Sequence, residues 1–364
     1  RTWSGITRNG QKNCSRSRIN LSVKISWESP SNIALIKYWG KHDIQIPSNP
    51  SISFTLSKCK TTTEVHFTEG AGISISLNGK DKPEFIPKIE SFLQRIKERH
   101  PWLDSYRLQI KTSNSFPHSS GIASSASGMS ALSLCIVEFA EKIGFKFGAL
   151  DFYQEASILS RLGSGSASRS IYGGLTIWGK SPYLKNSRDE YAIEYPEIIH
   201  PIFKNYCDVI LLVDNEEKEV SSTLGHSLMD SHPFNKQRFS QANKHVKDIK
   251  RILQTGNVDD FIQITELEAL TLHGLMMSSS PNFILMKPNT LKIIEKIREF
   301  RNNSKLPISF TLDAGANVHL LFPDSAKDKA MTFVKNTLIQ FCRGENFISD
   351  HVGSGPKRLT NFEE

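Results

Sequence analysis

A segment rich in serine and glycine leads directly into a long stretch with helical apolar periodicity, and this junction constrains the fold most. The segment covers residues 115–128, and Met129, Leu132 and Ile136 follow at the spacing of one helix face. Unpaired backbone N–H groups and the positive end of the helix dipole gather at such a junction, which suits an anion. The pattern favours a loop that binds nucleotide phosphate, although serine and glycine also form plain helix caps and flexible connections.

The periodicity of the whole chain predicts an α+β fold of two units. Alternating patterns and short apolar runs predict strands at 33–36, 52–56, 63–67, 73–77, 106–111, 175–178 and 207–213, with helices at 87–98 and 151–162. Long helical patterns follow at 235–254, 259–277, 289–301 and 325–342, around a hairpin of strands 308–312 and 318–322. We expect an N-terminal domain over 21–205 and a helix-rich C-terminal domain over 206–364. Residues 1–20 are polar and basic, which predicts a disordered arm.

Composition narrows the class of partner. The 364 residues carry a formal charge of +8, and the lysines and arginines are spread along the chain. Without a zinc-knuckle, RNA-recognition or zipper pattern, we expect anionic metabolites and no nucleic acid. No apolar run approaches the roughly 20 residues that span a bilayer, so no membrane partner is expected. Five cysteines, odd in number and far apart, indicate reduced thiols and a cytoplasmic location.

Two lysines flank aromatic residues at the end of the predicted strand 33–36. A lysine at a strand end can meet phosphate or carboxylate, and Lys41, beside Gly40, is the better placed of the pair Lys37 and Lys41. Tyr38 can hydrogen-bond a substrate or pack at the edge of the core. A solvated lysine at a strand terminus is the alternative interpretation.

Segment 163–169 combines flexible backbone, serine hydroxyls and one arginine. Arg169 follows Ser164 and Ser166, a composition expected where a guanidinium and hydroxyl groups hold a phosphate or carboxylate. The alternative is a helix C-cap with a surface arginine. The Gly-Ser-Gly-Ser run is longer than a C-cap requires, which favours the anion site.

One isolated carboxylate ends an apolar strand. Asp313 precedes small residues, and near a substrate hydroxyl it could act as general base or orient that hydroxyl toward a phosphoryl group. An Asx-turn aspartate that caps the hairpin is the alternative. Ser221 and Ser222 form a weaker candidate pair that could equally cap a helix. The histidines lack the spacing of a zinc site, and no Walker lysine or hydrolase elbow is present.

Together these segments resemble the mevalonate diphosphate decarboxylases, members of the GHMP small-molecule kinase superfamily. The matching runs are 32–41, 121–126, 163–174, 220–223 and 313–315. The resemblance implies the two-domain GHMP kinase fold, with an N-terminal ribosomal-protein-S5-domain-2-like domain and a C-terminal ferredoxin-like α+β domain. The active site would lie in the cleft between the domains.

The resemblance also implies an activity and catalytic roles. The activity is ATP-dependent decarboxylation of mevalonate 5-diphosphate to isopentenyl diphosphate, with release of ADP, phosphate and carbon dioxide, in isoprenoid biosynthesis. Asp313 would orient or deprotonate the C3 hydroxyl, and Arg169 would hold the substrate carboxylate. Lys41 would lie beside Asp313 and lower its pKa.

The remaining site residues follow from the same resemblance. Those at the substrate would be Tyr38, Lys41, Ser164, Ser166, Arg169 and Ser222. Those at ATP would be Pro117, Ser120, Gly121, Ala123, Ser124, Ser125 and Lys218, with Ser125 also at Mg²⁺. Two alternative activities are a decarboxylase of mevalonate 5-phosphate and a kinase without decarboxylation. The chain could also assemble as a homodimer. A nucleic-acid-binding protein is the rival of another class, and it predicts salt-sensitive oligonucleotide binding.

Overall fold

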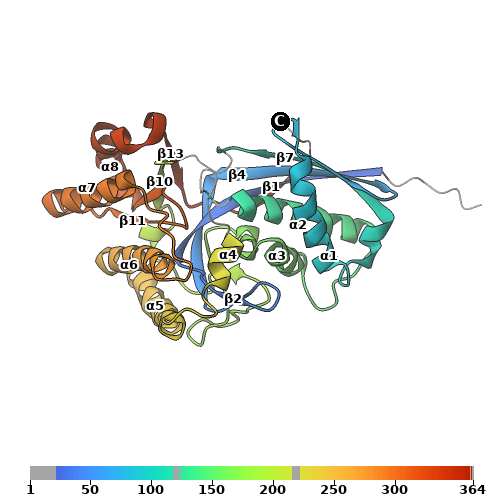
Figure 1. The fold of residues 1–364 in the computed structure, drawn as a ribbon, viewed down its shortest axis with the longest axis horizontal. Helices are drawn as coiled ribbons and strands as arrows, with labels where there is room; N and C mark the ends of the chain where they lie inside the picture. The colour runs from blue at the N-terminus through green and yellow to red at the C-terminus, as the bar shows by residue number, and fades with distance from the viewer. Residues whose placement is uncertain (1–21, 118–121, 123, 215–221, 361, 363–364) are drawn as a thin grey trace, which may run out of the picture.

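A computed structural model describes residues 22–117, 122, 124–214, 222–360 and 362. Two lobes lie side by side, one built on a long twisted sheet and the other on a smaller sheet covered by helices (Figure 1). The α+β class predicted from the periodicity is confirmed. The expected arm at residues 1–20 lies outside the described residues.

The sheet of the first lobe is built on two long antiparallel strands, β1 (Ser22–Ile36) and β4 (Ser51–Glu69). One edge of β4 pairs along its length with β8 (Leu175–Trp178) and then β7 (Tyr106–Asn114). The sheet continues through β5 (Ile73–Leu77) and β6 (Lys80–Asp81), while β9 (Ile193–Glu194) pairs with β8. The separate strands expected at 52–56 and 63–67 are therefore one, because β-favouring threonines carry the extended backbone across the polar residues between them.

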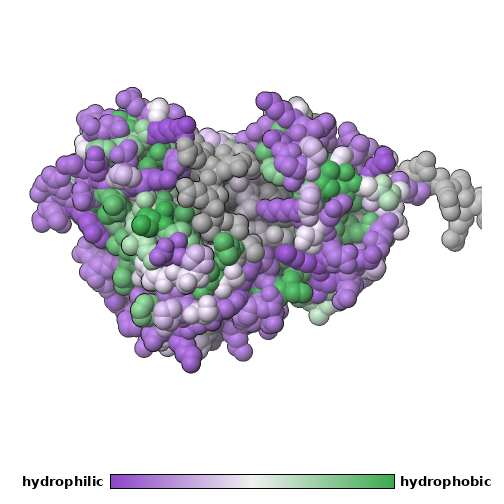
Figure 2. Space-filling view, viewed as in Figure 1, coloured by the Kyte–Doolittle hydropathy of each residue, from purple (hydrophilic) through white to green (hydrophobic). Residues whose placement is uncertain are grey.

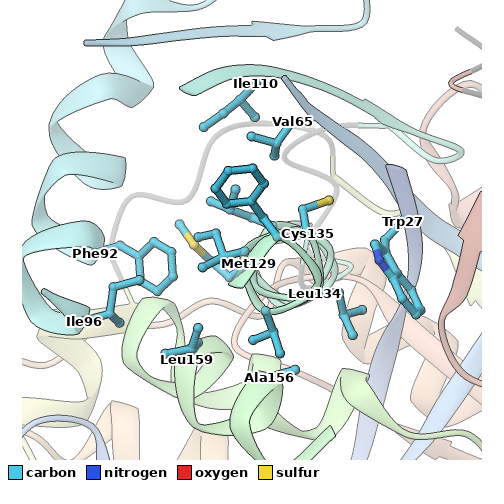
Figure 3. Packing of buried hydrophobic residues seen from close by; sticks show 14 of the residues in the cluster. Trp27, Val65, Phe92, Ile96, Ile110, Met129, Leu134, Cys135, Ala156 and Leu159 are labelled. Atoms are coloured by element: carbon cyan, nitrogen blue, oxygen red, sulfur yellow. The ribbon is translucent and has the colours of Figure 1, made fainter. Parts of the chain in front are cut away.

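Three helices cover one face of this sheet. The buried helix α2 (Ser124–Lys142) packs between the sheet and the helices α1 (Ile86–Ile96) and α3 (Phe152–Gly163). Figure 3 shows Met129 and Cys135 of α2 between Val65 of the sheet and Leu159 of α3. Asp151 caps α3 by accepting a hydrogen bond from the Gln154 amide at 2.8 Å. A 3₁₀ helix (Gly165–Ile171) follows α3 and carries Arg169.

The second lobe has a four-stranded antiparallel sheet. Its order is β11 (Ser309–Thr311), β12 (Val318–Phe322), β10 (Cys207–Leu211) and β13 (Phe347–His351). Its helices are α4 (Ser222–Ser227), α5 (Asn235–Thr255), α6 (Val258–Met277), α7 (Pro288–Ser304) and α8 (Lys327–Phe333). The predicted hairpin is confirmed, whereas the helix expected over 325–342 is wrong beyond Phe333. There the chain continues as a π turn (Val334–Leu338) and a 3₁₀ turn (Ile339–Phe341), which bury both Val334 and Leu338.

Strand pairing, apolar packing and hydrogen bonds hold the two lobes together, in addition to the chain that connects them. The strand β14 (Lys357–Leu359) returns to the first sheet and pairs with β1. One apolar cluster contains Leu35 of the first lobe with Val246 and Leu321 of the second. The Asp350 carboxylate of the second lobe accepts backbone N–H groups of residues 57–59 in β4 at 2.8–3.0 Å. The boundary at 205/206 stays a prediction, since residues near the C-terminus build part of the first sheet.

The composition predicts that the chain lacks a membrane span and that its cysteines are reduced. Within those ranges, no helix combines the length and apolar character that a membrane crossing requires. Cys59, Cys135, Cys207 and Cys342 are buried free thiols, as the reduced state predicts.

Close backbone packing where the C-terminal segment crosses β4 gives a stability test. A Cβ on Gly353 would lie 2.5 Å from the Leu56 carbonyl oxygen, whereas a Cβ on Gly274 in α6 meets nothing within 4 Å. We expect Gly353→Ala to lower the free energy of unfolding by about 1–3 kcal/mol, because backbone must move. Gly274→Ala, the matched control, should be neutral or stabilising by up to about 1 kcal/mol. Urea unfolding checks both, and equal stabilities would contradict the packing described.

Candidate active site

A cavity of about 500 Å³ opens where the two lobes meet. It lies at the C-terminal end of β1, between α1, the 3₁₀ helix (Gly165–Ile171), α4, α6 and the β11–β12 loop. Figure 2 shows hydrophilic residues along most of the periphery of one face, interrupted by hydrophobic patches. The cavity is lined by Ala34, Lys37, Tyr38, Trp39, Lys41, Gln45, Lys88, Ser91, Phe92, Arg95, Ser125, Gly163, Ser164, Gly165, Ser166, Arg169, His226, Leu272, Asp313 and Ala314.

The described lining is strongly basic. Lys37, Lys41, Lys88, Arg95 and Arg169 line it together with a single carboxylate, that of Asp313. The positive charges of such a wall attract an anionic ligand. The Asp313 carboxylate is the lining group suited to accept a proton from it. The small anionic partner expected from composition therefore has a place to bind.

The partner of Asp313 is Lys37, and the prediction that Lys41 would pair with it is wrong. The Lys37 Nζ lies 3.0 Å from Asp313 Oδ1, while the Lys41 Nζ donates to Gln45 Oε1 at 2.8 Å. Lys37 directly follows the last residue of β1 and points inward. Gly40, with a φ of +96°, turns the chain before Lys41, so that Lys41 lines another part of the cavity.

The Lys37 ammonium is buried, and the Asp313 side chain is partly open to the cavity, with exposures of 2% and 27%. Burial lowers the pKa of Lys37, while the negative charges of Asp313 and Glu268 oppose that shift. On its other side, the Asp313 carbonyl oxygen accepts a hydrogen bond from His273 Nε2 at 3.1 Å. Burial lowers the pKa of His273 to about 4, so this histidine is neutral at pH 7.

Arg169 is a buried cation held by uncharged groups. Its hydrogen bonds go to Ser51 Oγ at 2.6 Å, Ser53 Oγ at 3.1 Å and Asn32 Oδ1 at 3.1 and 3.3 Å. Two of the five N–H groups of the guanidinium are left over by these contacts. Because the cavity reaches this side chain, an anionic ligand can supply the missing counter-charge.

Tyr38 and the serine segment form a polar wall next to Arg169. The Tyr38 hydroxyl is buried without a hydrogen-bond partner among the described residues. A Cβ on Gly165 would lie 2.8 Å from that hydroxyl, which explains the glycine. Ser164 and Ser166 line the cavity, and Ser125 Oγ lies 3.4 Å from Ser164 Oγ. The N-terminus of α2 thus meets the serine segment.

His226 is a residue that sequence reasoning missed. It lines the cavity from α4, accepts the Gly40 amide on Nδ1 at 3.1 Å, and packs against Tyr38 with the rings tilted by 34° and their centroids 4.1 Å apart. Burial, with Lys41 and Arg169 nearby, lowers the pKa of His226 to about 3. A histidine is recognised in a sequence mainly by the spacing of metal ligands. His226 has no such spacing, because its contacts in the structure are packing and a hydrogen bond.

Several residues predicted to bind ATP, and Ser222, predicted to bind the substrate, fall wholly or partly outside what the structure describes. Ser120, Gly121, Ala123 and Lys218 lie outside the described residues, as does the side chain of Ser222, the first residue of α4. Among those described, Ser125 lines the cavity and Ser124 begins α2. Pro117 is exposed and does not belong to the described lining.

A two-lobed α+β fold, with a basic cavity between a strand end, the serine segment and a helix N-terminus, is typical of small-molecule enzymes of the GHMP kinase type. Comparison with known families narrows this class. Residues 29–189 match the diphosphomevalonate decarboxylase-like N-terminal domain, and residues 208–360 match the mevalonate 5-diphosphate decarboxylase C-terminal domain. The chain belongs to the diphosphomevalonate decarboxylase family.

Individual relatives agree with this assignment. The diphosphomevalonate decarboxylase of Candida albicans is 28% identical over 322 residues, covering 84% of this chain and 86% of the relative. The crystal structure of mevalonate diphosphate decarboxylase from Staphylococcus aureus superposes with a TM-score of 0.80 at 27% identity, over 93% of this chain and 98% of that one. A structure described as MDDEF in complex with MVAPP, AMPPCP and magnesium also has a TM-score of 0.80, at 26% identity, covering 93% of this chain and 99% of that chain.

The buried histidine gives a pH test. The pKa of His226 is about 3 in the folded chain, below its ordinary value of 6.5. Between those values the unfolded chain binds a proton that the folded chain does not, so stability falls as the pH falls. We expect His226→Asn, which can still accept the Gly40 amide, to flatten this fall by up to about 1.4 kcal/mol per pH unit. Urea unfolding at pH 6.5, 5.5 and 4.5 measures the slope, and an unchanged slope would contradict a neutral His226.

Proposed function

We propose that this chain decarboxylates mevalonate 5-diphosphate at the expense of ATP, and that the cavity between the lobes is its active site. Family membership supports the reaction, and the Lys37–Asp313 pair beside a buried Arg169 is the observation that carries the site. The products are isopentenyl diphosphate, ADP, phosphate and carbon dioxide. We also propose a role in isoprenoid and lipid biosynthesis, which follows from the proposed product. The free buried thiols among the described residues support a cytoplasmic setting.

The first step in this proposal is phosphoryl transfer to the C3 hydroxyl of the substrate. The Asp313 carboxylate, partly open to the cavity, accepts the hydrogen bond of that hydroxyl and takes its proton as the oxygen attacks the γ-phosphorus of ATP. ADP leaves with the electrons of the broken P–O bond. The Lys37 ammonium donates to Asp313 Oδ1 at 3.0 Å and so holds the carboxylate in place.

The second step breaks two bonds of the phosphorylated intermediate. Phosphate leaves C3 with the C–O electron pair, and the C1–C2 pair then forms the C2–C3 double bond as carbon dioxide is released. Arg169 holds the C1 carboxylate with its two unused N–H groups, which keeps the breaking C1–C2 bond aligned with the departing phosphate. The Tyr38 hydroxyl, Lys41, Ser164 and Ser166 bind the anionic groups of the substrate around it.

The serine hydroxyl at the N-terminus of α2 fits a nucleotide-bound magnesium ion. Mg²⁺ takes oxygen ligands and keeps waters and phosphates in its shell, and it needs few protein groups. Ser125, which lines the cavity and approaches Ser164, supplies such an oxygen. The ion would neutralise phosphate charge on ATP. We propose that Ser124, Ser125 and the loop before them hold the ATP phosphates.

A product assay with three substrates tests the function. Mevalonate, its 5-phosphate and its 5-diphosphate are each incubated with ATP and Mg²⁺, and ADP, phosphate and carbon dioxide are measured. We expect the 5-diphosphate to give the highest kcat/KM with equal amounts of all three products. Preference for the 5-phosphate would assign the chain to the alternative decarboxylase. ADP release with a stable phosphorylated product and no carbon dioxide would make it a kinase.

Loss of the proton-accepting carboxylate tests the role of Asp313. Asp313→Asn keeps the shape of the side chain but cannot take a proton, so we expect kcat to fall at least about 10²–10⁴-fold. Affinity for ATP, measured by titration, should change by less than about threefold. Asp328→Asn, at an exposed position of α8, is the control and should retain the wild-type kcat. A kcat for Asp313→Asn close to that of the control would assign the proton transfer to another group.

A further inference from the structure

A buried cluster of ionisable side chains in the second lobe lies next to the backbone of Lys37. Glu268 of α6 forms a bidentate ion pair with Arg238 of α5, both contacts being 2.7 Å. His245 of α5 donates to the same carboxylate from Nδ1. Burial alone would raise the pKa of Glu268, but Arg238 and His245 lower it to about 2, so the carboxylate is ionised. None of these three residues belongs to the described lining of the cavity.

The cluster forms hydrogen bonds with both the amide and the carbonyl group of Lys37. Glu268 Oε2 accepts the Lys37 amide at 2.8 Å, and Arg238 Nη2 donates to the Lys37 carbonyl oxygen at 2.8 Å. Asn49 adds a second donor to that carbonyl at 2.9 Å. The strand β1 ends at Ile36, so Lys37 stands beyond the ladder that holds the preceding residues. Side chains of α5 and α6 therefore replace the sheet at this residue.

The contacts make the position of the Lys37 ammonium depend on the cluster. Glu268 receives four donors on two oxygen atoms, so neither oxygen can move without leaving a buried donor unpaired. A residue whose own N–H and C=O are both held cannot rotate its backbone freely. The side chain that leaves from it is then directed at Asp313, 3.0 Å away.

We propose that Glu268 and Arg238 are positioning residues for the reaction: they fix the Lys37 backbone, and through it the Lys37–Asp313 pair. This inference rests on the proposed function. Arg238 and Glu268 come from the second lobe, like Asp313, whereas Lys37 comes from the first. The same cluster therefore aligns the two halves of the site across the lobe boundary.

The chain contains a matched control for this cluster. In the first lobe, the buried Glu155 of α3 is bound by Arg99 and by His100 in the same combination of carboxylate, guanidinium and imidazole. Its carboxylate makes no contact with Lys37, and none of its members lines the described cavity. Glu155→Gln and Glu268→Gln both remove a buried charge from an arginine and a histidine, and both should lower stability. Only Glu268→Gln should disturb Lys37.

The experiment compares kcat and KM of wild type, Glu268→Gln and Glu155→Gln, with folded enzyme counted by circular dichroism and unfolding curves. We expect Glu268→Gln to lower kcat per folded enzyme at least about tenfold, with KM for ATP within about threefold. Glu155→Gln should keep the wild-type kcat. Equal kcat values for the two variants would overturn the inference. A wild-type chain that releases no ADP and carbon dioxide would instead refute the proposed function.

A pH profile separates positioning from simple loss of folded protein. The charged and titratable groups around Lys37 are Asp313, Glu268, His273, Arg169 and Arg238. Loss of the Lys37 proton at alkaline pH breaks the ion pair with Asp313, so kcat should fall there. Removing the negative charge of Glu268 lowers the Lys37 pKa. The alkaline fall in kcat should therefore move to lower pH in Glu268→Gln and stay in place in Glu155→Gln. An alkaline limb that stays in place in both variants would contradict the inference. If Glu268→Gln does not fold, His245→Asn replaces it, with a kcat below that of Glu155→Gln expected and an equal kcat contradicting the inference.

Discussion

Burial of the Lys37 ammonium against Asp313 is the interaction on which the rest of the site depends. A buried ammonium costs several kcal/mol unless a carboxylate and hydrogen bonds compensate it, and the carboxylate that forms its ion pair, that of Asp313, comes from the other lobe. The lobes must therefore close in one relative position for Lys37 to be stable. The hairpin loop, the end of β1 and helices α5 and α6 are all arranged around that requirement.

The described wall of the cavity carries several basic side chains but a single carboxylate. Asp313 is the one described carboxylate on the wall, and the basic groups surround it. Histidines that touch this region, His226 and His273, are kept neutral by burial, so they add hydrogen bonds without adding to the positive charge. Arg169 is bound only by uncharged oxygens, which leaves its charge available to a ligand. The arrangement favours a substrate with several negative groups and one hydroxyl near Asp313.

Much of this could be predicted from the sequence, and the failures have physical causes. Periodicity located α5, α7 and the hairpin whose loop carries Asp313, because a local amphipathic or alternating pattern determines each of them. The choice of Lys41 over Lys37 was wrong because burial and the positive φ of Gly40 are tertiary facts that the local motif does not contain. The support of Lys37 by Glu268 was invisible for the same reason: the two residues are far apart in the chain and meet only after α6 packs beside β1.

The pairing of β14 with β1 has a consequence for how the chain reaches this structure. The first sheet can form early during synthesis, but one edge of β1 is covered only by residues made much later. Until then, those N–H and C=O groups of residues 26–28 that face away from β4 are open to pairing with another chain. The nascent first lobe thus carries an exposed strand edge, a hazard for aggregation that chaperones would have to cover until translation supplies β14.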